Sequence, residues 1–303
     1  MKYPLKVSVL IVTYNHEKYI KEALESIIMQ RHDFSQEIIV ADDCSSDNTL
    51  EIIEEFAEKH ENIKILPTTN NLGITKNYKR GFAACSGEYI AVLEGDDYWT
   101  SPHKISTMVK FLDDNRGCAL AFNRFIVAET DSKRFNIQPW PIREKFQLIT
   151  ISDLIQDNMI GNFSTCVYRN ENIKNIDPSL YDFKVYDWMF NMVNAQFGLI
   201  GYIPEVMSVY RLHPNGTWTQ KTEIEKINDI ITSIDEYNKY FNYIYDNDFQ
   251  AHKNRLLGRI SEGNTPPTSK QKLKQLIISF TPPFILSIVK LIMPPKVIEI
   301  FKK

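Results

Sequence analysis

The sequence predicts an α/β protein in which helices flank a mixed, mainly parallel sheet. Apolar runs alternate with helical patterns over residues 1–130, at the spacing of strand–helix–strand units. The first run, VSVLIV at 7–12, is continuous and rich in β-branched residues, which favours a strand buried on both faces. Hydrophobic residues make up 43% and charged residues 24% of the 303-residue chain, as in a globular protein. Together these observations indicate a doubly wound sheet.

Each element of the alternation has its own signal. The expected strands lie at 7–12, 37–43, 62–68, 88–97 and 118–129. The expected helices lie at 17–30, 48–60, 75–85 and 103–115. The first helix places Ile20, Leu24 and Ile27 at helical spacing. Asp47 can cap the second helix, and Pro102 is expected at the first position of the fourth.

Beyond residue 130 the alternation weakens. Residues 131–150 read as a polar loop, short elements resume over 151–218, and a long helical stretch follows near 220–260. The segment SEGNTPPTS at 261–269 is typical of a linker. We therefore expect one α/β domain over 1–218 and a helical C-terminal region over 219–303.

The end of the chain combines short apolar runs with lysines. Each run is shorter than the ~20 residues that span a bilayer. An interfacial helix lying on anionic lipid is therefore favoured, and a helical pair packed on the main domain is the alternative. The lysines expected to face lipid are Lys272, Lys274, Lys290, Lys296, Lys302 and Lys303.

Charge and cysteine content exclude several classes. The formal net charge of -3 argues against nucleic acid as a partner, because no bulk positive field attracts phosphates. The four cysteines show no C-x-x-C pairing, which disfavours a zinc knuckle or a redox motif. The opening MKYPLKVSVLIVTYN reads as a strand rather than a signal peptide. A reducing, cytoplasmic location is expected.

Polar residues gather where three predicted strands end. They are Thr13, Tyr14 and Asn15 after the first strand, Asp42 and Asp43 after the second, and Glu94, Asp96 and Asp97 after the fourth. Ligands of open α/β sheets bind outside these strand ends, at the point where the strand order reverses. Two like charges 4 Å apart repel by ~1 kcal/mol in water and by more in a protein. The crowded acids therefore predict a bound cation or a shared proton.

The ligand class follows from what the strand ends offer. The chain contains neither G-x-G-x-x-G nor G-x-x-x-x-G-K-[ST], which disfavours a dinucleotide site or a P-loop. A carboxylate cluster can still hold a diphosphate through a divalent metal ion. Tyr14 offers a ring on which a base can stack, and Asp43 can accept the imide N–H of a uracil. These roles together describe a site for a nucleotide sugar.

Four segments carry a resemblance to a known family. VSVLIVTYN, EIIVADDCSSDNT, NNLGITKNYKRGFAACSGEYIAVLEGDDYW and VYDWMF resemble, in this order, the motifs of family-2 glycosyltransferases with the GT-A fold. The resemblance covers about residues 5–215 and implies that 1–218 is a catalytic domain.

The resemblance also implies a role for each matched residue. The strand-one segment with Thr13, Tyr14 and Asn15 would bind the nucleotide together with Asp43. Asp96 would hold the ribose and, with Asp97, the metal; Asp187 would act as catalytic base; and His213 would lie near the diphosphate and the metal. Two departures are Glu94, where the family commonly has Asp, and Cys44, where it commonly has Gly.

Several residues keep two interpretations at this point. Lys76 and Arg80 either meet phosphate or lie on a solvated helix face, and Asp42 is either a ligand or a structural acid. Asp187 alternatively caps its helix. Trp99 and Trp218 either stack on sugar rings or pack in the protein.

The implied activity is metal-dependent, inverting glycosyl transfer. The expected donor is a nucleoside diphosphate sugar, specifically a UDP-sugar, and the expected cofactor is Mn²⁺ or Mg²⁺. The expected acceptor is a glycan or a lipid-linked oligosaccharide in bacterial cell-surface polysaccharide or glycolipid biosynthesis, at the inner face of the cell membrane. A non-catalytic nucleotide-sugar or carbohydrate-binding scaffold is the alternative. A nucleotidyltransferase is disfavoured because VTYNHEKY lacks a basic phosphate loop.

Overall fold

The computed structural model describes residues 5–138, 146–214, 216 and 219–264. The chain divides into two compact units, Met1–Lys253 and Asn254–Lys303. The first unit contains every described strand and extends past the range 1–218 that the sequence predicts for the catalytic domain. The predicted interfacial tail and Trp218 lie outside the described residues, as does the linker beyond residue 264.

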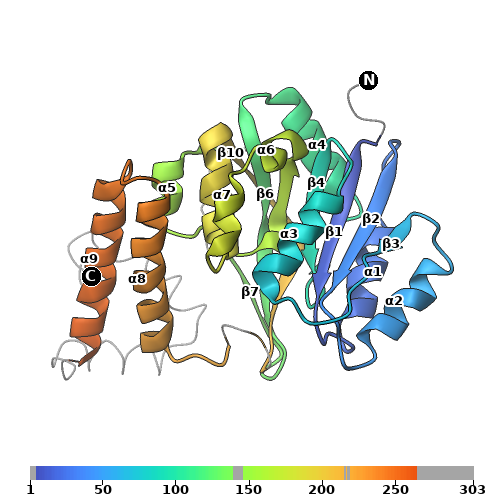
Figure 1. The fold of residues 1–303 in the computed structure, drawn as a ribbon, viewed down its shortest axis with the longest axis horizontal. Helices are drawn as coiled ribbons and strands as arrows, with labels where there is room; N and C mark the ends of the chain where they lie inside the picture. Colours follow the sequence, from blue (N-terminus) through green and yellow to red (C-terminus); the bar gives the residue numbers. More distant parts are fainter. Residues whose placement is uncertain (1–4, 139–145, 215, 217–218, 265–303) are drawn as a thin grey trace, which may run out of the picture. The chain divides into compact units, whose positions relative to one another are not determined.

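In the described part of the chain, ten strands form one mixed sheet (Figure 1). Their order is β3-β2-β1-β4-β9-β6-β10-β5, with β7 paired to β6 and β8 paired to β10. The strands β1 to β4, β6 and β10 run parallel, whereas β9 and β5 run antiparallel to their neighbours. Their bounds are β1 Val7–Thr13, β2 Gln36–Asp42, β3 Ile63–Ile65, β4 Tyr89–Glu94, β5 Tyr98–Trp99, β6 Cys118–Glu129, β7 Arg134–Ile137, β8 Gln147–Ile149, β9 Cys166–Arg169 and β10 Leu199–Leu212.

Helices connect the strands and continue toward the C-terminus. Their bounds are α1 Ile20–Ile28, α2 Thr49–Ala57, α3 Ile74–Ala84, α4 Lys104–Asp114, α5 Ile151–Gln156, α6 Asn170–Lys174, α7 Asp187–Asn194, α8 Glu223–Tyr240 and α9 Asp246–Asn264. Short 3₁₀ turns are η1 Phe163–Thr165, η2 Pro178–Asp182 and η3 Ala195–Phe197. Within the described ranges, no helix combines the length and apolar character that a membrane crossing requires.

Three details differ from the sequence prediction. The helix α4 begins at Lys104, so Pro102 precedes it and does not occupy its first position. Residues 131–150 contain β7 and β8 rather than only a loop, because the end of β6 turns back on itself and pairs with Arg134–Ile137. Asn48 is the residue before α2, although the Asp47 carboxylate does accept the backbone N–H of Thr49 at 3.0 Å.

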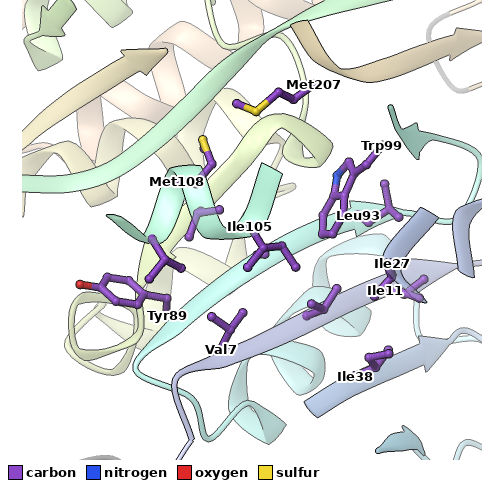
Figure 2. Close-up of a cluster of buried hydrophobic side chains, with 14 of the residues drawn as sticks. Val7, Ile11, Ile27, Ile38, Tyr89, Leu93, Trp99, Ile105, Met108 and Met207 are labelled. Carbon is purple, nitrogen blue, oxygen red and sulfur yellow. The ribbon is translucent and has the colours of Figure 1, made fainter. Parts of the chain in front are cut away.

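Strand β1 is buried on both faces, as its apolar run predicts. Val7 and Ile11 point into a cluster shared with α1 and α4 (Figure 2). Leu10 points to the other face and packs against α3, where a Cβ on Gly81 would lie 2.7 Å from Leu10 Cδ1. Burial of each such side chain contributes about 1.5–3 kcal/mol, so this strand anchors the sheet.

Stacked aromatic rings join α3, η1 and α7. The rings of Phe82 and Phe190 lie 4.5 Å apart with an interplanar angle of 7°, and those of Tyr78 and Phe163 lie 4.3 Å apart. Such pairs add about 0.5–1.5 kcal/mol beyond the burial of their area. The cluster therefore fixes the turn η1 and the start of α7 against the central part of the sheet.

The parallel register brings the polar strand ends together. Thr13 pairs with Asp42 across β1 and β2, and Val12 pairs with Glu94 across β1 and β4. The chain adds β2 and β3 on one side of β1 and β4 on the other, so the strand order reverses between β1 and β4. Ligands of open α/β sheets bind at such a reversal.

The turn before β4 generates a stability prediction. A Cβ on Gly87 would lie 2.5 Å from the backbone N of Ser8 and 2.7 Å from the carbonyl carbon of Val7, and a strand backbone cannot move aside as a side chain can. We expect Gly87→Ala to lower the free energy of unfolding by about 1–3 kcal/mol in urea denaturation. Gly117→Ala is the control, because its Cβ would enter open space and should change the value by less than about 0.5 kcal/mol. Equal stabilities of the two variants would contradict this packing.

Candidate active site

Two cavities lie at the carboxyl ends of β1, β2 and β4. The larger has a volume of about 300 Å³ and is lined by the ends of these strands and by α3. The smaller has a volume of about 90 Å³, and Asp187 and Asn162 are among its lining residues. Glu94 and Asp96 line both, so the acids that follow β4 lie between the two cavities.

The larger cavity is lined by four of the residues predicted to bind the nucleotide, namely Asp96 and the three described next. Tyr14 lines it with a side chain that is 44% exposed, and Thr13 lines it from the end of β1. Asp43 also lines it, and its two carboxylate oxygens accept the backbone N–H groups of Leu72 at 2.8 Å and Gly73 at 2.9 Å. These bonds hold the Asp43 carboxylate in one orientation and leave further lone pairs for a ligand.

Other predicted residues organise the neighbouring loop instead. The side-chain oxygen of Asn15 accepts the backbone N–H of Ser46 at 2.8 Å, and Asp42 accepts the backbone N–H of Ser45 at 2.9 Å. Neither Asn15 nor Asp42 lines a described cavity. Cys44 has a φ of 63°, a conformation that glycine adopts more readily. This conformation accounts for the glycine that the family commonly has at the position of Cys44.

The two predicted phosphate contacts lie away from both cavities. The Arg80 guanidinium donates to Asn77 Oδ1 at 2.7 Å, to the Pro67 carbonyl at 2.9 Å and to the Asp42 carbonyl. It therefore joins α3 to the ends of β2 and β3 as a structural residue. Lys76 is exposed on α3 and lines neither cavity in the described part of the chain.

The three acids after β4 have different surroundings. Glu94 accepts the Tyr78 hydroxyl at 2.9 Å, and burial, followed by the charges of Asp96 and Asp97, raises the pKa of Glu94 well above its usual value. Burial also acts to raise the pKa of Asp96, but the hydrogen bond from His213 and the charge of His16 outweigh it and hold the pKa below its usual value. Asp96 is therefore the acid of this cluster that stays charged most readily.

The sequence analysis predicts Asp97 as a metal ligand, but the structure places it away from both cavities. It is fully buried and lines neither described cavity. Its oxygens accept the Ser164 hydroxyl at 2.6 Å and the Arg211 backbone N–H at 2.9 Å, and burial together with Asp96 raises its pKa well above the usual value. The chain turns after Glu94, where the Asp97 N–H donates to the Glu94 carbonyl at 3.0 Å, and this turn leaves Asp96 at the cavities and Asp97 in the protein interior. Asp97 thus serves in this structure as a link between β4 and β10.

A histidine pair faces Asp96. The Nε2 atom of His213 lies 3.0 Å from Asp96 Oδ2, and the Nε2 atom of His16 lies 3.7 Å from the same oxygen. A Cβ on Gly95 would lie 2.5 Å from Thr13 Oγ1 and 2.9 Å from His16 Nδ1, so glycine permits this close approach. His213 was predicted here, whereas His16 was missed although it follows directly after the predicted Asn15.

Sequence reasoning also missed Arg211 and Ser164. Arg211 donates to the Asp96 carbonyl at 2.7 Å and forms an ion pair with Glu22. The Ser164 hydroxyl holds Asp97, and its carbonyl accepts the indole N–H of Trp99 at 2.9 Å. Trp99 is therefore a packing residue in this structure and not a platform for a sugar. In the sequence, the only signal for Arg211 is its position two residues before the predicted His213, and Ser164 has no such signal.

Asp187 stands at the first position of α7, after Tyr186, and lines the smaller cavity. Its Oδ2 accepts a hydrogen bond from Asn158 Nδ2 at 3.0 Å. Burial raises the pKa of Asp187 to about 6, although the bond from Asn158 acts in the opposite direction. A carboxyl group with such a pKa can accept a proton near neutral pH.

A divalent metal ion fits this site only with help from a ligand. No group of three or more His, Cys, Asp or Glu side chains suited to a metal is present among the described residues. Asp96 and His213 nevertheless place an oxygen and a nitrogen donor side by side, and His213 Nδ1 is buried without a hydrogen-bond partner in the described ranges. Mg²⁺ is commonly held by one or two carboxylates together with substrate phosphates. The pair is therefore sufficient for an ion shared with a diphosphate.

The fold and the acid-lined cavities define an α/β protein with a ligand site at the carboxyl ends of its parallel strands. The family model described as "Glycosyl transferase family 2" matches residues 8–175, and the chain belongs to this family. This confirms the predicted family and the predicted GT-A fold.

Curated relatives support the assignment. An uncharacterized protein of Mycobacterium tuberculosis is 35% identical over 215 residues, which cover 70% of this chain and 60% of that protein. The chain thus matches about 60% of the length of this relative. The putative teichuronic acid biosynthesis glycosyltransferase TuaG of Bacillus subtilis is 25% identical over 236 residues, covering 73% of this chain and 89% of TuaG.

Solved structures share the fold. S. aureus TarS (residues 1–349) in complex with UDP has a TM-score of 0.57 at 22% identity, covering 77% of this chain and 65% of that one. The mannosyltransferase PcManGT of Pyrobaculum calidifontis, in complex with GDP-Man and Mn²⁺, has a TM-score of 0.59 at 14% identity, covering 94% of this chain and 83% of that one.

The contact between Asn158 and Asp187 generates a second prediction. A hydrogen bond to the charged carboxylate favours that form, so its loss in Asn158→Ala should raise the pKa of Asp187 above about 6. Carbon-13 NMR titration of the carboxyl signal, assigned with Asp187→Asn, measures the change. In the control Asn175→Ala, whose amide donates to the Glu171 carbonyl, the pKa should stay as in the wild type. An unchanged or lower pKa in Asn158→Ala would show that the contact does not stabilise the anion.

Proposed function

We propose that the chain is a metal-dependent, inverting glycosyltransferase that moves a sugar from a UDP-sugar to a hydroxyl group of a glycan or lipid-linked acceptor. One observation carries the proposal. A carboxyl group with a pKa of about 6, Asp187, lines a cavity together with Glu94 and Asp96, and the same two acids line the larger cavity that contains Tyr14 and Asp43. A proton acceptor and a nucleotide-sized space therefore adjoin one acid cluster.

The larger cavity would take the nucleotide. Tyr14 offers its exposed ring to the base, and Asp43 offers a fixed carboxylate to a base N–H. The complexes of TarS with UDP and with UDP-GlcNAc support a uridine nucleotide, whereas the complex of PcManGT with GDP-Man leaves a guanosine nucleotide as a candidate to test. The proposal therefore names the UDP-sugar first and requires a donor panel.

Asp96 and His213 would hold the metal ion. The mutual position of their side chains supports this pair, and the burial of Asp97 argues for Asp96 in place of Asp97 as the acidic ligand. A bound Mn²⁺ or Mg²⁺ would neutralise the charge that develops on the leaving diphosphate. The complex of PcManGT with Mn²⁺ supports such a requirement.

Asp187 would act as the general base. Its charged form accepts the proton of the acceptor hydroxyl while that oxygen attacks the anomeric carbon. The new carbon–oxygen bond forms on the face opposite the diphosphate, the bond to the diphosphate oxygen breaks, and UDP leaves with the electron pair. Attack from the opposite face inverts the anomeric configuration. A pKa of about 6 keeps most Asp187 side chains charged at pH 7.

The acceptor belongs to cell-surface polymer synthesis in this proposal. TuaG is named for teichuronic acid biosynthesis, which supports an anionic or lipid-linked glycan as the acceptor. The alternative, a binding scaffold without turnover, would keep the larger cavity but would not need a proton acceptor of raised pKa. The release of UDP from UDP-sugars therefore distinguishes the two.

Removal of the base is the central test. Asp187→Asn should lower the rate of UDP release by roughly 10²-fold or more, the scale of general-base catalysis, because an amide cannot take the proton. The dissociation constant for UDP, measured by calorimetry, should stay within about twofold because Asp187 does not line the larger cavity. The wild-type rate should fall as the pH drops below about 6, since protonation inactivates the base. Normal turnover by the variant would rule out this base.

Metal removal is a separate test. EDTA should abolish UDP release and added Mn²⁺ should restore it. His213→Ala should raise the Mn²⁺ concentration needed for half-maximal rate by roughly 10-fold or more. Asp97→Asn is the comparison, because the buried Asp97 is expected to affect melting temperature rather than this concentration. Full activity in EDTA would refute the metal requirement.

A further inference from the structure

Asn162 lines the smaller cavity, and its buried side-chain amide is unpaired within the described residues. Only 4% of the residue is exposed, yet neither the oxygen nor the nitrogen of its side chain has a hydrogen-bond partner among the described residues. Other buried asparagines in the same ranges, such as Asn194 and Asn238, lack a partner for the oxygen but donate through the nitrogen. Buried polar groups are normally paired, so an amide unpaired at both ends calls for a partner that is not part of the chain.

Local contacts hold the backbone of Asn162 in place. Asn162 precedes η1, and its carbonyl accepts the Thr165 hydroxyl at 2.9 Å, while its side chain does not cap the turn. On one side Gly161 has a φ of 83°, with the Phe125 ring 2.7 Å from where a Cβ would lie. On the other side Phe163 is stacked on Tyr78. The backbone of Asn162 is therefore fixed, and its side-chain amide stays available for a bond to a ligand.

The cavity indicates what the partner is. Asn162 lines it together with Asp187, Glu94 and Asp96, and the last two also line the nucleotide cavity. In the proposed function this is the space between the leaving diphosphate and the base, which the transferred sugar must occupy.

The chemistry of the amide narrows the choice further. A carboxamide presents one acceptor and two donor hydrogens, and a sugar hydroxyl both donates and accepts, whereas a phosphate oxygen mainly accepts. We infer that Asn162 hydrogen-bonds one or two ring hydroxyls of the transferred sugar and thereby contributes to the choice of donor. The inference rests on the proposed function and assigns a specificity residue to it.

The experiment compares two ligands that differ only by the sugar. Dissociation constants are measured by calorimetry for UDP and for UDP-glucose, UDP-galactose and UDP-GlcNAc, and the UDP-sugar that the wild type binds most tightly is used. Asn162→Ala should weaken binding of that UDP-sugar by about 3- to 15-fold, the value of one or two neutral hydrogen bonds, and leave UDP within twofold. Asn238→Ala, the matched control from α8, should change neither constant, since Asn238 lines neither cavity.

A second arm tests the same contact from the side of the ligand, and its wild-type titrations do not depend on the variant's folding. Deoxy analogues of the chosen UDP-sugar, each lacking one ring hydroxyl, are titrated into the wild type and into Asn162→Ala. The analogue that lacks the contacted hydroxyl should bind the wild type less tightly and the variant with no further loss, because the two changes remove the same bond. Equal losses for every analogue in both proteins would overturn the inference, as would an effect on UDP as large as on the UDP-sugar.

The outcome separates this inference from the proposed function. If the wild-type protein bound neither UDP nor any UDP-sugar, that result would contradict both the proposed function and the proposed role of Asn162. Binding of both ligands with unchanged discrimination in Asn162→Ala would overturn the role of Asn162 alone. An effect confined to the Michaelis constant of the acceptor would assign the amide to the acceptor and would also overturn the inference as stated.

Discussion

The constraint on which the site depends is the crowding of three carboxyl groups into four residues, from the last residue of β4, Glu94, to Asp97. The structure relieves this repulsion by separating their surroundings. Glu94 and Asp97 are held where burial and neighbouring charge favour the protonated form, whereas His213 and His16 keep Asp96 charged. Raised pKa values at Glu94 and Asp97 let these acids take up protons more readily, and each proton taken up lowers the repulsion in the cluster. The same distribution leaves a single anionic oxygen beside a histidine, which is the arrangement that the proposed ion needs.

The sheet provides the geometry for this distribution. Parallel pairing aligns the ends of β1, β2 and β4, so Thr13, Asp43 and Glu94 arrive at one edge although they are far apart in the sequence. The remaining half of the site comes from the segment before β9 and from α7, which the stacked rings of Phe82 and Phe190 hold against α3. The residues of the proposed nucleotide cavity and the proposed catalytic base, Asp187, are thus attached to one core of aromatic and aliphatic side chains.

Periodicity predicted the five strands β1 to β4 and β6, and strand-end chemistry predicted the gathering of Asp43, Glu94 and Asp96. The place of Asp187 near them was expected from the family resemblance alone. These patterns could not predict which of two adjacent aspartates faces the ligand, because that depends on the local twist after β4 and on bonds from Ser164 and the backbone of Arg211. These partners come from segments 67 and 114 residues away. Arg80 and Asn15 were expected at the nucleotide for their chemistry, yet loop carbonyls and N–H groups are nearer to them. Hydrogen bonds between residues far apart in the chain cannot be predicted from the spacing of neighbouring residues.

The bond from the Trp99 indole to the Ser164 carbonyl has a practical consequence. The hydroxyl of the same serine donates to Asp97 and accepts the backbone N–H of Glu94. Two hydrogen bonds, both through Ser164, therefore connect the indole to the acid cluster, and the Trp99 side chain is buried. In a variant whose other three tryptophans are replaced, the ultraviolet emission of Trp99 would therefore report on that cluster without any attached dye.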